Sequence, residues 1–382
     1  MSSKRIRVAV LYGGRSGEHE VSLQSAASVI RNLDPERFTI IPIGIDRDGG
    51  WHLNDLAMMA DGAAKSLPVF RDAPPVMLPP FSGDGERSLL RLGPGGEAQG
   101  IDVVFPVMHG PLCEDGAIQG LCELADVPYV GPGVLASAVG MDKDVAKRLV
   151  AADGLPIVPY LSLKRDRWDR ERGADAGAGL AGWVAENLGY PAFVKPANMG
   201  SSVGIHKVSS AAELGRALDD AFRYDVKVLI ERGVDAREIE LAVLENIASS
   251  DEPLVSIPGE IAPSHEFYSY EAKYLDEHGA ALMIPAALDP AETERAQSMA
   301  RRIFSALECE GMARVDLFLD RKSGEFYFNE INTIPGFTTI SMYPKLWEAS
   351  GIGYRELLSR LIDLALARHE RKRGLSREWL AE

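Results

Sequence analysis

The stretch at residues 313–332, ARVDLFLDRKSGEFYFNEIN, decides how the chain is expected to fold. Apolar and polar residues alternate on both sides of a polar run, Arg321–Gly324. Alternation of this kind is typical of two half-buried strands joined by a tight turn. We therefore predict a β-hairpin whose strands run over Ala313–Leu319 and Glu325–Ile331.

The predicted hairpin gathers oxygen-bearing side chains. Strand alternation places Arg314 and Asp316 on one face, and Glu330 and Asn332 together on one face of the partner strand. The turn sets Asp316 opposite Asn329 or Glu330. Oxygen ligands without His or Cys suit Mg²⁺, which proteins hold with one or two carboxylates plus substrate phosphates. The alternative is an ordinary solvated face, which is weakened because facing carboxylates repel each other without a cation.

A second candidate is the segment PAFVKPANMGSSVGIHKV at residues 191–208. Lys195 ends an apolar strand, Tyr190–Lys195, and the chain re-enters a strand at Val203–Val208 after the loop NMGSS. Backbone amides in a Gly/Ser loop can cradle phosphate oxygens, and the lysine supplies a cation. The lysine precedes the glycines, so this is not a Walker loop. The alternative is a hairpin whose glycines only satisfy the turn.

The amino-terminal part predicts an open parallel α/β domain. Strands are expected at Arg7–Tyr12, Phe38–Ile45 and Ile101–Met108, with helices at Leu23–Leu33 and Ala117–Ala125. Sheets of this kind bind ligands at the carboxyl ends of their strands.

Two polar side chains follow strands at that edge of the sheet. Glu18 lies in the loop GGRSGEHEVS and could bind a substrate ammonium, although Glu18 or Glu20 could equally be a first-turn carboxylate that complements the helix dipole. His109 ends a strand in PVMHGPLCEDG. A lone histidine there is more often structural than catalytic, but the edge it shares with Glu18 favours a functional role.

The rest of the chain predicts a mixed α+β region. Helices are expected at Asp142–Ala152 (with Asp142 as N-cap), Ala211–Phe222, Pro290–Leu307 and Tyr354–Arg368, and strands at Val226–Ile230, Ile239–Leu244 and Val255–Ile261. We expect domains at 1–131, 132–230 and 231–370, with a tail at 371–382. Residues 46–100 are rich in Gly, Pro and Asp and are expected to be a variable excursion without chemistry.

Composition restricts the partners and the compartment. The 382 residues include 41 Lys and Arg against 56 Asp and Glu, a net charge of −15 that disfavours nucleic acid and anionic membranes. The three cysteines form no CxxC pair, so neither a disulfide framework nor a zinc site is indicated. The apolar run Val8–Tyr12 is too short for a signal-peptide core, and no run approaches the length of a spanning helix. A soluble cytoplasmic protein is expected.

Seven motifs in order resemble those of the D-alanine:D-alanine ligase family of the ATP-grasp superfamily. They are GGRSGEHEVSL, HGPLCEDGAIQG, MDKDVAK, VKPANMGSSVGI, YEAKY, RVDLFL and NEINTIPGFTTISMYP. The resemblance runs from about Val8 to about Leu364 and is weak at residues 46–100 and 164–182. It implies an ATP-grasp fold, in which two α+β lobes clamp ATP and Mg²⁺, after the amino-terminal α/β domain. In the loop after His109, Pro111 and Cys113 depart from the glycine-rich run common in the family.

The resemblance also implies the reaction. ATP phosphorylates the carboxylate of one D-alanine, and the amine of a second D-alanine displaces phosphate to give the dipeptide used in peptidoglycan. Two Mg²⁺ ions, for which Mn²⁺ can substitute, and a homodimer are expected on the same ground. The alternatives are a D-alanine:D-lactate or D-alanine:D-serine ligase, or a nucleotide-binding regulatory module that has lost catalysis.

The family's functional residues transfer to positions of this sequence. Those implied for nucleotide and metal are Lys143 and Lys195 at the phosphates, Ser201, Ser202 and Val203 in the loop over them, Glu231 and Val234 at the adenine, Glu238 at the ribose, Lys273 at the γ-phosphate, and Asp316, Glu330 and Asn332 as Mg²⁺ ligands. Those implied for the amino acids are Glu18 at the first ammonium, Ser201 and Tyr274 linked to it, His109 beside them, Arg314 and the Gly336 amide at the oxyanion, and Ser341 with the Met342 amide at the second carboxylate. Tyr274 disfavours the D-lactate ligase, which usually carries a histidine there. The polar segment 264–281, which holds Lys273 and Tyr274, is expected to be a lid.

Overall fold

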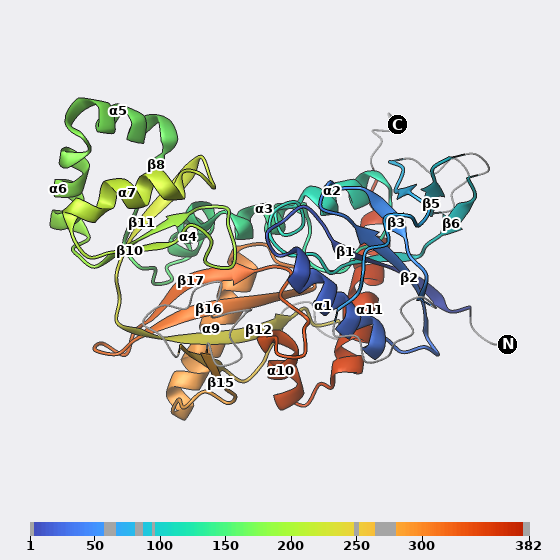
Figure 1. Cartoon of the computed structure of the whole chain (residues 1–382). Coiled ribbons are helices and arrows are strands. Elements are labelled where there is room, and N and C mark those ends of the chain that lie inside the picture. Colours follow the sequence, from blue (N-terminus) through green and yellow to red (C-terminus); the bar gives the residue numbers. More distant parts are fainter. Residues whose placement is uncertain are drawn as a thin grey trace, which may run out of the picture.

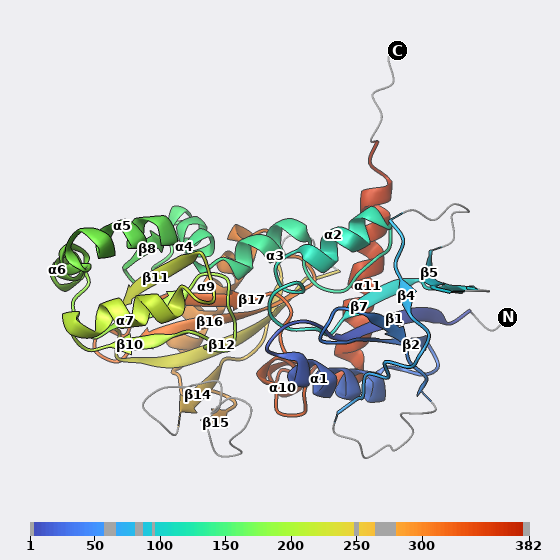
Figure 2. The ribbon, with the colours of Figure 1, turned by 45° about the horizontal axis from the view of Figure 1, so that its top comes forward.

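The computed structural model describes residues 4–56, 66–80, 87–93, 96–247, 252–263 and 280–376. Lys273, Tyr274 and most of the predicted lid lie outside the described residues. Three larger sheets organise the described residues (Figure 1). The amino-terminal sheet lies at one end, and the sheet of β8 to β11 stacks over the β16–β17 part of the third sheet at the other end (Figures 1 and 2).

The amino-terminal sheet confirms the predicted open α/β arrangement. Its strand order is β3-β2-β1-β7, and β1 pairs in parallel with both β2 and β7. The elements are β1 (Ile6–Gly13), α1 (His19–Asn32), β2 (Phe38–Ile45), β3 (Trp51–Leu53), β7 (Val103–Pro106) and α2 (Ala117–Leu124). Helix α1 begins four residues before the predicted Leu23. Val8 to Tyr12 are fully buried, which explains the continuous apolar run of β1.

The excursion at residues 46–100 has more structure than its composition indicated. Besides β3 it contributes a small antiparallel sheet of β4 (Val76–Met77), β5 (Ser88–Arg91) and β6 (Ala98–Gly100). These strands have at most four residues, so they are too short to leave a periodic pattern in the sequence.

The second larger sheet has the order β10-β9-β11-β8 and is antiparallel throughout. Its strands are β8 (Tyr160–Lys164), β9 (Ala192–Pro196), β10 (His206–Val208) and β11 (Lys227–Arg232), and its helices are α5 (Arg165–Asp175), α6 (Ala178–Asn187) and α7 (Ala211–Ala221). The sequence did not predict β8, α5 or α6. Helix α5 is highly charged, and its one buried side chain, Trp168, anchors it to the apolar core beneath.

The third sheet has six strands in the order β15-β14-β12-β16-β17, with β13 paired to β12. The strands are β12 (Ala236–Leu244), β13 (Leu254–Val255), β14 (Gly259–Pro263), β15 (Ala280–Met283), β16 (Met312–Asp320) and β17 (Phe326–Asn332). Further helices among the described residues are α3 (Val134–Met141), α4 (Lys143–Ala152), α9 (Pro290–Ala306), α10 (Met342–Ala349) and α11 (Tyr354–Arg373). Asp142 caps α4 as predicted, because its carboxylate accepts hydrogen bonds from the Asp144 and Val145 amides at 3.1 Å each. Helices α3 and α10 were not predicted.

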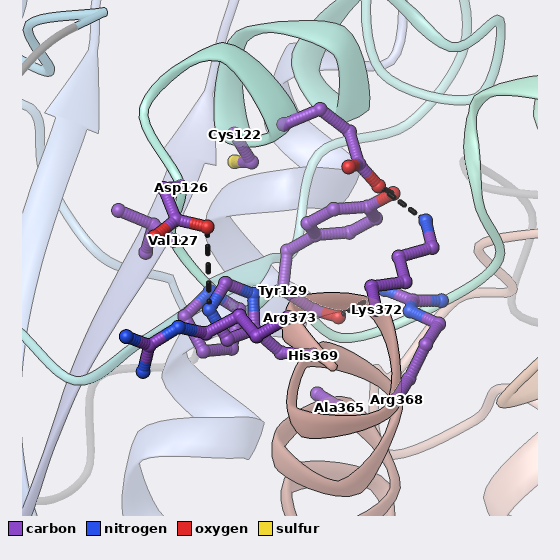
Figure 3. Close-up of a pocket in the computed structure, with 11 residues that line it drawn as sticks. Cys122, Asp126, Val127, Tyr129, Ala365, Arg368, His369, Lys372 and Arg373 are labelled. Atoms are coloured by element: carbon purple, nitrogen blue, oxygen red, sulfur yellow. Dashed lines mark hydrogen bonds and ion pairs between the residues drawn. The ribbon is translucent and has the colours of Figure 1, made fainter. Parts of the chain in front are cut away.

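Helix α11 packs against residues 122–131, at the end of the amino-terminal domain (Figure 3). The buried Arg368 donates to the carbonyl oxygens of Tyr129 and Gly131, and its guanidinium lies 4.3 Å from the centre of the Tyr129 ring. The Lys372 ammonium lies 2.6 Å from the Glu123 carboxylate, so the helix continues in ordered contacts beyond its predicted end at Arg368. In the part of the chain that the structure describes, we find no helix with the length and apolarity needed to span a membrane.

Candidate active site

The β16–β17 hairpin has one of the two registers that the sequence left open for Asp316. Asp316 pairs with Glu330, and Arg314 pairs with Asn332. Residues directly opposite one another on antiparallel strands point to the same face, so all four polar side chains share one face. Ala313 and Val315, which alternate with them, are fully buried in the core on the other face. A β-bulge between Asp316 and Leu317 leaves Asn329 as the extra residue beside Glu330.

Arg314 is held by two carboxylates. Its Nε and one terminal nitrogen lie 2.7 and 2.6 Å from the two oxygens of Asp316, and Nε also lies 3.0 Å from a Glu240 oxygen. Burial lowers the pKa of Arg314, but Asp316 and Glu240 outweigh burial and raise it. Glu240, which faces Asp316 across the β12–β16 pair, was not predicted from the sequence. Because Glu240 follows Glu238 by two residues, strand alternation places both side chains on one face of the strand. The sequence did not indicate that Glu240 lies opposite Asp316.

The three proposed metal ligands fit a hard cation that also binds phosphate. Asp316, Glu330 and Asn332 offer oxygen atoms from adjacent positions of one sheet face. Among the described residues, no group of three or more His, Cys, Asp and Glu side chains is arranged to hold a metal on its own. Two carboxylates and one amide oxygen, completed by substrate phosphates, match the way proteins usually hold Mg²⁺.

Lys195 lies in β9, where its ammonium has a carboxylate partner. Its Nζ donates to a Glu231 oxygen at 2.5 Å and lies 3.4 Å from the Asn329 amide oxygen. Glu231 is buried, and its other oxygen lies 2.6 Å from Nζ of Lys147. Burial raises the pKa of Glu231, but Lys147 and Lys195 outweigh burial and lower it to about 2. The sequence predicted Lys195 but not its pairing with Glu231, and it missed Lys147.

Lys143 links the glycine loop to the hairpin. It is the first residue of α4, and its Nζ donates to the Met199 carbonyl oxygen at 2.7 Å. The same ammonium lies 3.3 Å from a Glu330 oxygen. The Lys143 ammonium therefore lies between the predicted phosphate loop and the predicted metal ligands.

The predicted phosphate loop has an unusual backbone. Ser201 and Ser202 adopt φ angles of 52° and 60°, in the left-handed region that non-glycine residues rarely occupy. Val203 belongs to this loop rather than to a strand, because β10 begins only at His206. The Ser201 hydroxyl donates to the Glu18 carboxylate, 183 residues away in the sequence. Strained backbone held by a long-range contact is typical of a ligand-binding loop.

The Glu18 side chain accepts a hydrogen bond from the predicted phosphate loop and does not cap the helix that it precedes. It occupies the N-cap position of α1, but its side chain makes no capping hydrogen bond. Glu20 lies in the first turn, is exposed and pairs with Arg47, so Glu20 is the carboxylate that matches the helix-dipole interpretation. A Cβ atom at Gly110 would lie 2.9 Å from a Glu18 oxygen, so a glycine is needed beside this carboxylate.

His109 is buried beneath the loop that follows β17. Its Nδ1 lies 3.3 Å from the Ile334 carbonyl oxygen, and its Nε2 lies 3.0 Å from the Ser25 hydroxyl. The same hydroxyl accepts a hydrogen bond from the Phe337 amide at 3.2 Å. Burial lowers the pKa of His109, but Glu114 outweighs burial and raises it. These contacts indicate that His109 positions the Ile334–Phe337 segment.

The segment after β17 brings the last predicted residues together. Met342 is the first residue of α10, and helix amino termini favour carboxylates. The Ser341 hydroxyl accepts from the Thr338 amide at 2.9 Å. A Cβ atom at Gly336 would lie 2.8 Å from the Ser341 hydroxyl oxygen, so the close approach requires glycine.

The predicted adenine and ribose residues lie at the connection between two sheets. Glu231 is in β11, and Val234 lies in the short link to β12. Glu238 is half-buried in β12, opposite Phe318 of β16. The link between β11 and β12, which we call the hinge, therefore joins the sheet that holds Lys195 to the sheet that holds Asp316.

Family models match most of the chain. The model described as "D-ala D-ala ligase N-terminus" matches residues 7–132, and "D-ala D-ala ligase C-terminus" matches residues 149–363. The chain belongs to the D-alanine–D-alanine ligase family. This membership confirms the resemblance found in the sequence motifs and, with the structural neighbours, the ATP-grasp fold.

Individual relatives of this family match over nearly the whole chain. D-alanine–D-alanine ligase A of Bradyrhizobium diazoefficiens is 59% identical, and the D-alanine–D-alanine ligase of Heliobacterium modesticaldum is 51% identical; each alignment covers 98% of both chains. The D-alanine-D-alanine ligase structure from Coxiella burnetii superposes with a TM-score of 0.81 at 36% identity and covers 97% of both chains. VanG D-Ala:D-Ser ligase from Enterococcus faecalis has a TM-score of 0.79 at 36% identity and covers 95% of this chain and all of its own.

Proposed function

We propose that this ligase uses ATP to join two D-alanine molecules into D-alanyl-D-alanine for peptidoglycan synthesis. The observation that carries the proposal is a polar path through Glu18, Ser201, Lys143 and Glu330, whose contacts are joined by the loop backbone between Met199 and Ser201. It runs from the Glu18–Ser201 contact, through the Met199 carbonyl to Lys143, and on to Glu330. The path supports a single site in which a carboxylate binds an ammonium, a loop binds phosphates and further oxygen atoms bind Mg²⁺.

The nucleotide is bound by cations and backbone. Lys143 and Lys195 attract its phosphates, and the amides of the Ser201–Val203 loop cover them. At the hinge formed by Glu231 and Val234, a backbone amide and a backbone carbonyl bind the adenine, and Lys273 closes on the γ-phosphate. Mg²⁺ ions held by Asp316, Glu330 and Asn332 would neutralise charge on the phosphates during transfer.

The amino acids are bound on the side of the amino-terminal domain. Glu18 holds the ammonium of the first D-alanine, so that its carboxylate faces the γ-phosphate, and Tyr274 completes the link to Ser201. The resulting D-alanyl phosphate is attacked by the amine of the second D-alanine, whose carboxylate is bound by Ser341 and the Met342 amide. Arg314 and the Gly336 amide donate to the oxyanion of the tetrahedral intermediate, a contribution of about 3 to 4 kcal/mol per donor where it has been measured.

The acceptor requires its own test, because a D-Ala:D-Ser ligase is among the structural neighbours. The purified chain is incubated with ATP, Mg²⁺ and D-alanine alone, or with D-serine or D-lactate added at equal concentration. Phosphate release and product mass are measured together, with L-alanine as the control.

We expect D-alanine-dependent phosphate release and D-alanyl-D-alanine as the main product in every mixture that contains D-alanine. A mixed product in excess would instead identify a D-serine or D-lactate ligase. Binding of ATP without D-alanine-dependent phosphate release would favour the regulatory module.

We also propose a homodimer, on the ground of family membership alone. Sedimentation equilibrium should give twice the mass of the chain at micromolar concentration. The mass of a single chain at the concentration at which the enzyme is active would contradict this proposal.

A further inference from the structure

Behind the proposed phosphate site lies a cluster of three buried charges, Lys147, Glu231 and Lys195. Lys147 is 1% exposed and Glu231 is 2% exposed, while Lys195 is 8% exposed and borders the site. Lys147 lies one helical turn after Lys143 in α4, so both lysines project from the same side of this helix. The proposed mechanism uses Lys143 and Lys195 but gives Lys147 no task.

Each carboxylate oxygen of Glu231 has its own ammonium partner. Nζ of Lys147 lies 2.6 Å from one oxygen, and Nζ of Lys195 lies 2.5 Å from the other. Lys147 is further enclosed by the rings of Tyr160 and Phe328, whose centres lie 5.9 and 5.8 Å from its Nζ, and it donates to the Phe328 carbonyl at 3.2 Å. A side chain enclosed in this way has no path to a phosphate, so any effect of Lys147 on the nucleotide passes through Glu231.

The Glu231 carboxylate, which Lys147 and Lys195 share, determines how easily Lys195 can leave it to bind a phosphate. Attraction between opposite charges is strong where water is excluded, so a buried Glu231 with one lysine would hold that lysine tightly. A second ammonium on the same carboxylate leaves Glu231 paired when Lys195 turns toward phosphate. The contact between Lys195 and Asn329 at 3.4 Å lies on the hairpin side, next to the proposed metal ligand Glu330.

We propose that Lys147 is a positioning residue of the nucleotide site, which holds Glu231 so that Lys195 can exchange its carboxylate partner for a phosphate of ATP. This inference rests on the proposed function, because it assumes that Lys195 binds phosphate. Lys147 itself contacts neither the nucleotide nor the reacting atoms.

The test is calorimetric titration of the full chain with ADP and Mg²⁺, and separately with adenosine. Lys147→Met removes the second ammonium, so Glu231 should retain Lys195, and ADP affinity should fall about tenfold while adenosine affinity is unchanged. Lys147→Met combined with Glu231→Gln removes the competing carboxylate as well. The double variant should therefore bind ADP within about threefold of the wild type. Arg148→Met, on the exposed side of the same helix, is the matched control and should leave both affinities unchanged.

The outcomes separate this inference from the proposed function. If Lys195→Met leaves ADP affinity unchanged, the proposed phosphate site itself is wrong. If Lys195→Met weakens ADP binding but Lys147→Met does not, only the positioning role is wrong. Equal loss of ADP and adenosine affinity in Lys147→Met would indicate a merely structural role. If Lys147→Met does not fold, the test uses the variant that combines Lys147→Met with Glu231→Gln. ADP binding within about threefold of the wild type supports the inference, and ADP binding about ten times weaker overturns it.

Discussion

The two charged regions on either side of Lys143 have opposite excess charge. On the nucleotide side, Lys147 and Lys195 share the single carboxylate of Glu231. On the metal side, Glu240, Asp316 and Glu330 lie around the guanidinium of Arg314 on one sheet face. An excess of ammonium groups favours an incoming phosphate, and an excess of carboxylates favours an incoming cation. The comparison shows how one site can attract both halves of a metal–nucleotide complex.

Glu231 and Glu330, which pair with Lys195 and Lys143, differ in burial. Glu231 on the nucleotide side is 2% exposed, whereas the Glu330 side chain on the metal side is 30% exposed. Removing one partner from a fully buried charge group leaves an uncompensated charge, but a partly exposed carboxylate can be replaced with less loss. Replacement of Glu231 should therefore lower mainly the stability of the fold, and replacement of Glu330 mainly the turnover.

The largest effect is expected from Glu231→Gln, which leaves two buried ammonium groups without their carboxylate. The free energy of unfolding at pH 7 should fall by about 3 to 5 kcal/mol. The folded-state pKa of Glu231 is about 2, below the value of about 4.3 expected in an unfolded chain. The stabilisation is therefore complete above about pH 5 and is lost as pH falls toward 2, where the wild type and variant should converge. Denaturant unfolding across this range tests it, with Glu186→Gln on the exposed surface of α6 as the control.

On the metal side, Glu330→Gln should leave the fold intact and lower turnover by about 10² to 10³-fold, because one metal-holding charge is lost from the transition state. Glu325→Gln, an exposed carboxylate at the other end of the same strand pair, is the matched control and should keep normal turnover. Near-normal turnover of Glu330→Gln in saturating Mg²⁺ would remove Glu330 from the metal site.

A third effect concerns the amino-acid end of the polar path. Glu18→Gln keeps the shape and the acceptor for Ser201 but loses the charge for an ammonium, so the KM for the first D-alanine should rise about thirtyfold, or ~2 kcal/mol. Glu20→Gln, two residues along and exposed, should change KM by less than about twofold. Steady-state kinetics with D-alanine as the varied substrate distinguish the two carboxylates. Similar KM values for Glu18→Gln and Glu20→Gln would indicate that Glu18 does not bind the ammonium and only complements the helix dipole.

The smallest effect is expected from Mg²⁺ without nucleotide. The carboxylate excess of the metal side should bind the ion weakly and raise the melting temperature by about 1 to 2 °C at millimolar Mg²⁺. Asp316→Asn should abolish this rise, whereas Lys195→Met on the nucleotide side should keep it. A rise that persists in Asp316→Asn would place the ion elsewhere.

Local patterns were sufficient to predict the metal side of the site. The alternation around Arg321–Gly324 predicted the hairpin, and a tight turn limits which residues face each other, so the sequence restricted the partner of Asp316 to Asn329 or Glu330. The structure selects Glu330. The bulge at Asn329 was not visible, because an extra residue in one strand leaves the alternation of its neighbours almost unchanged.

The nucleotide side could not be predicted in the same way. The contact of Lys147 with Glu231 joins a helix to a strand 84 residues later, and no local periodicity reports such a pair. Helix α10 was missed because Pro344 lies in its first turn and PGFTT precedes it, although proline is tolerated at that position. Tertiary packing of Tyr343 and Trp347 into the amino-terminal core supports this short helix, and that packing has no local signal.

The central claim is that one side of the site binds phosphate and the other binds the metal. Calorimetric titration with ADP, in the presence and absence of Mg²⁺, tests it most directly in the wild type and in Glu330→Gln. We predict that Mg²⁺ strengthens ADP binding in the wild type, and that Glu330→Gln keeps the metal-free affinity but loses most of the strengthening. If Glu330→Gln retains the full Mg²⁺ effect, or if its metal-free affinity for ADP falls as far as that of Lys195→Met, the division of the site into these two sides is wrong.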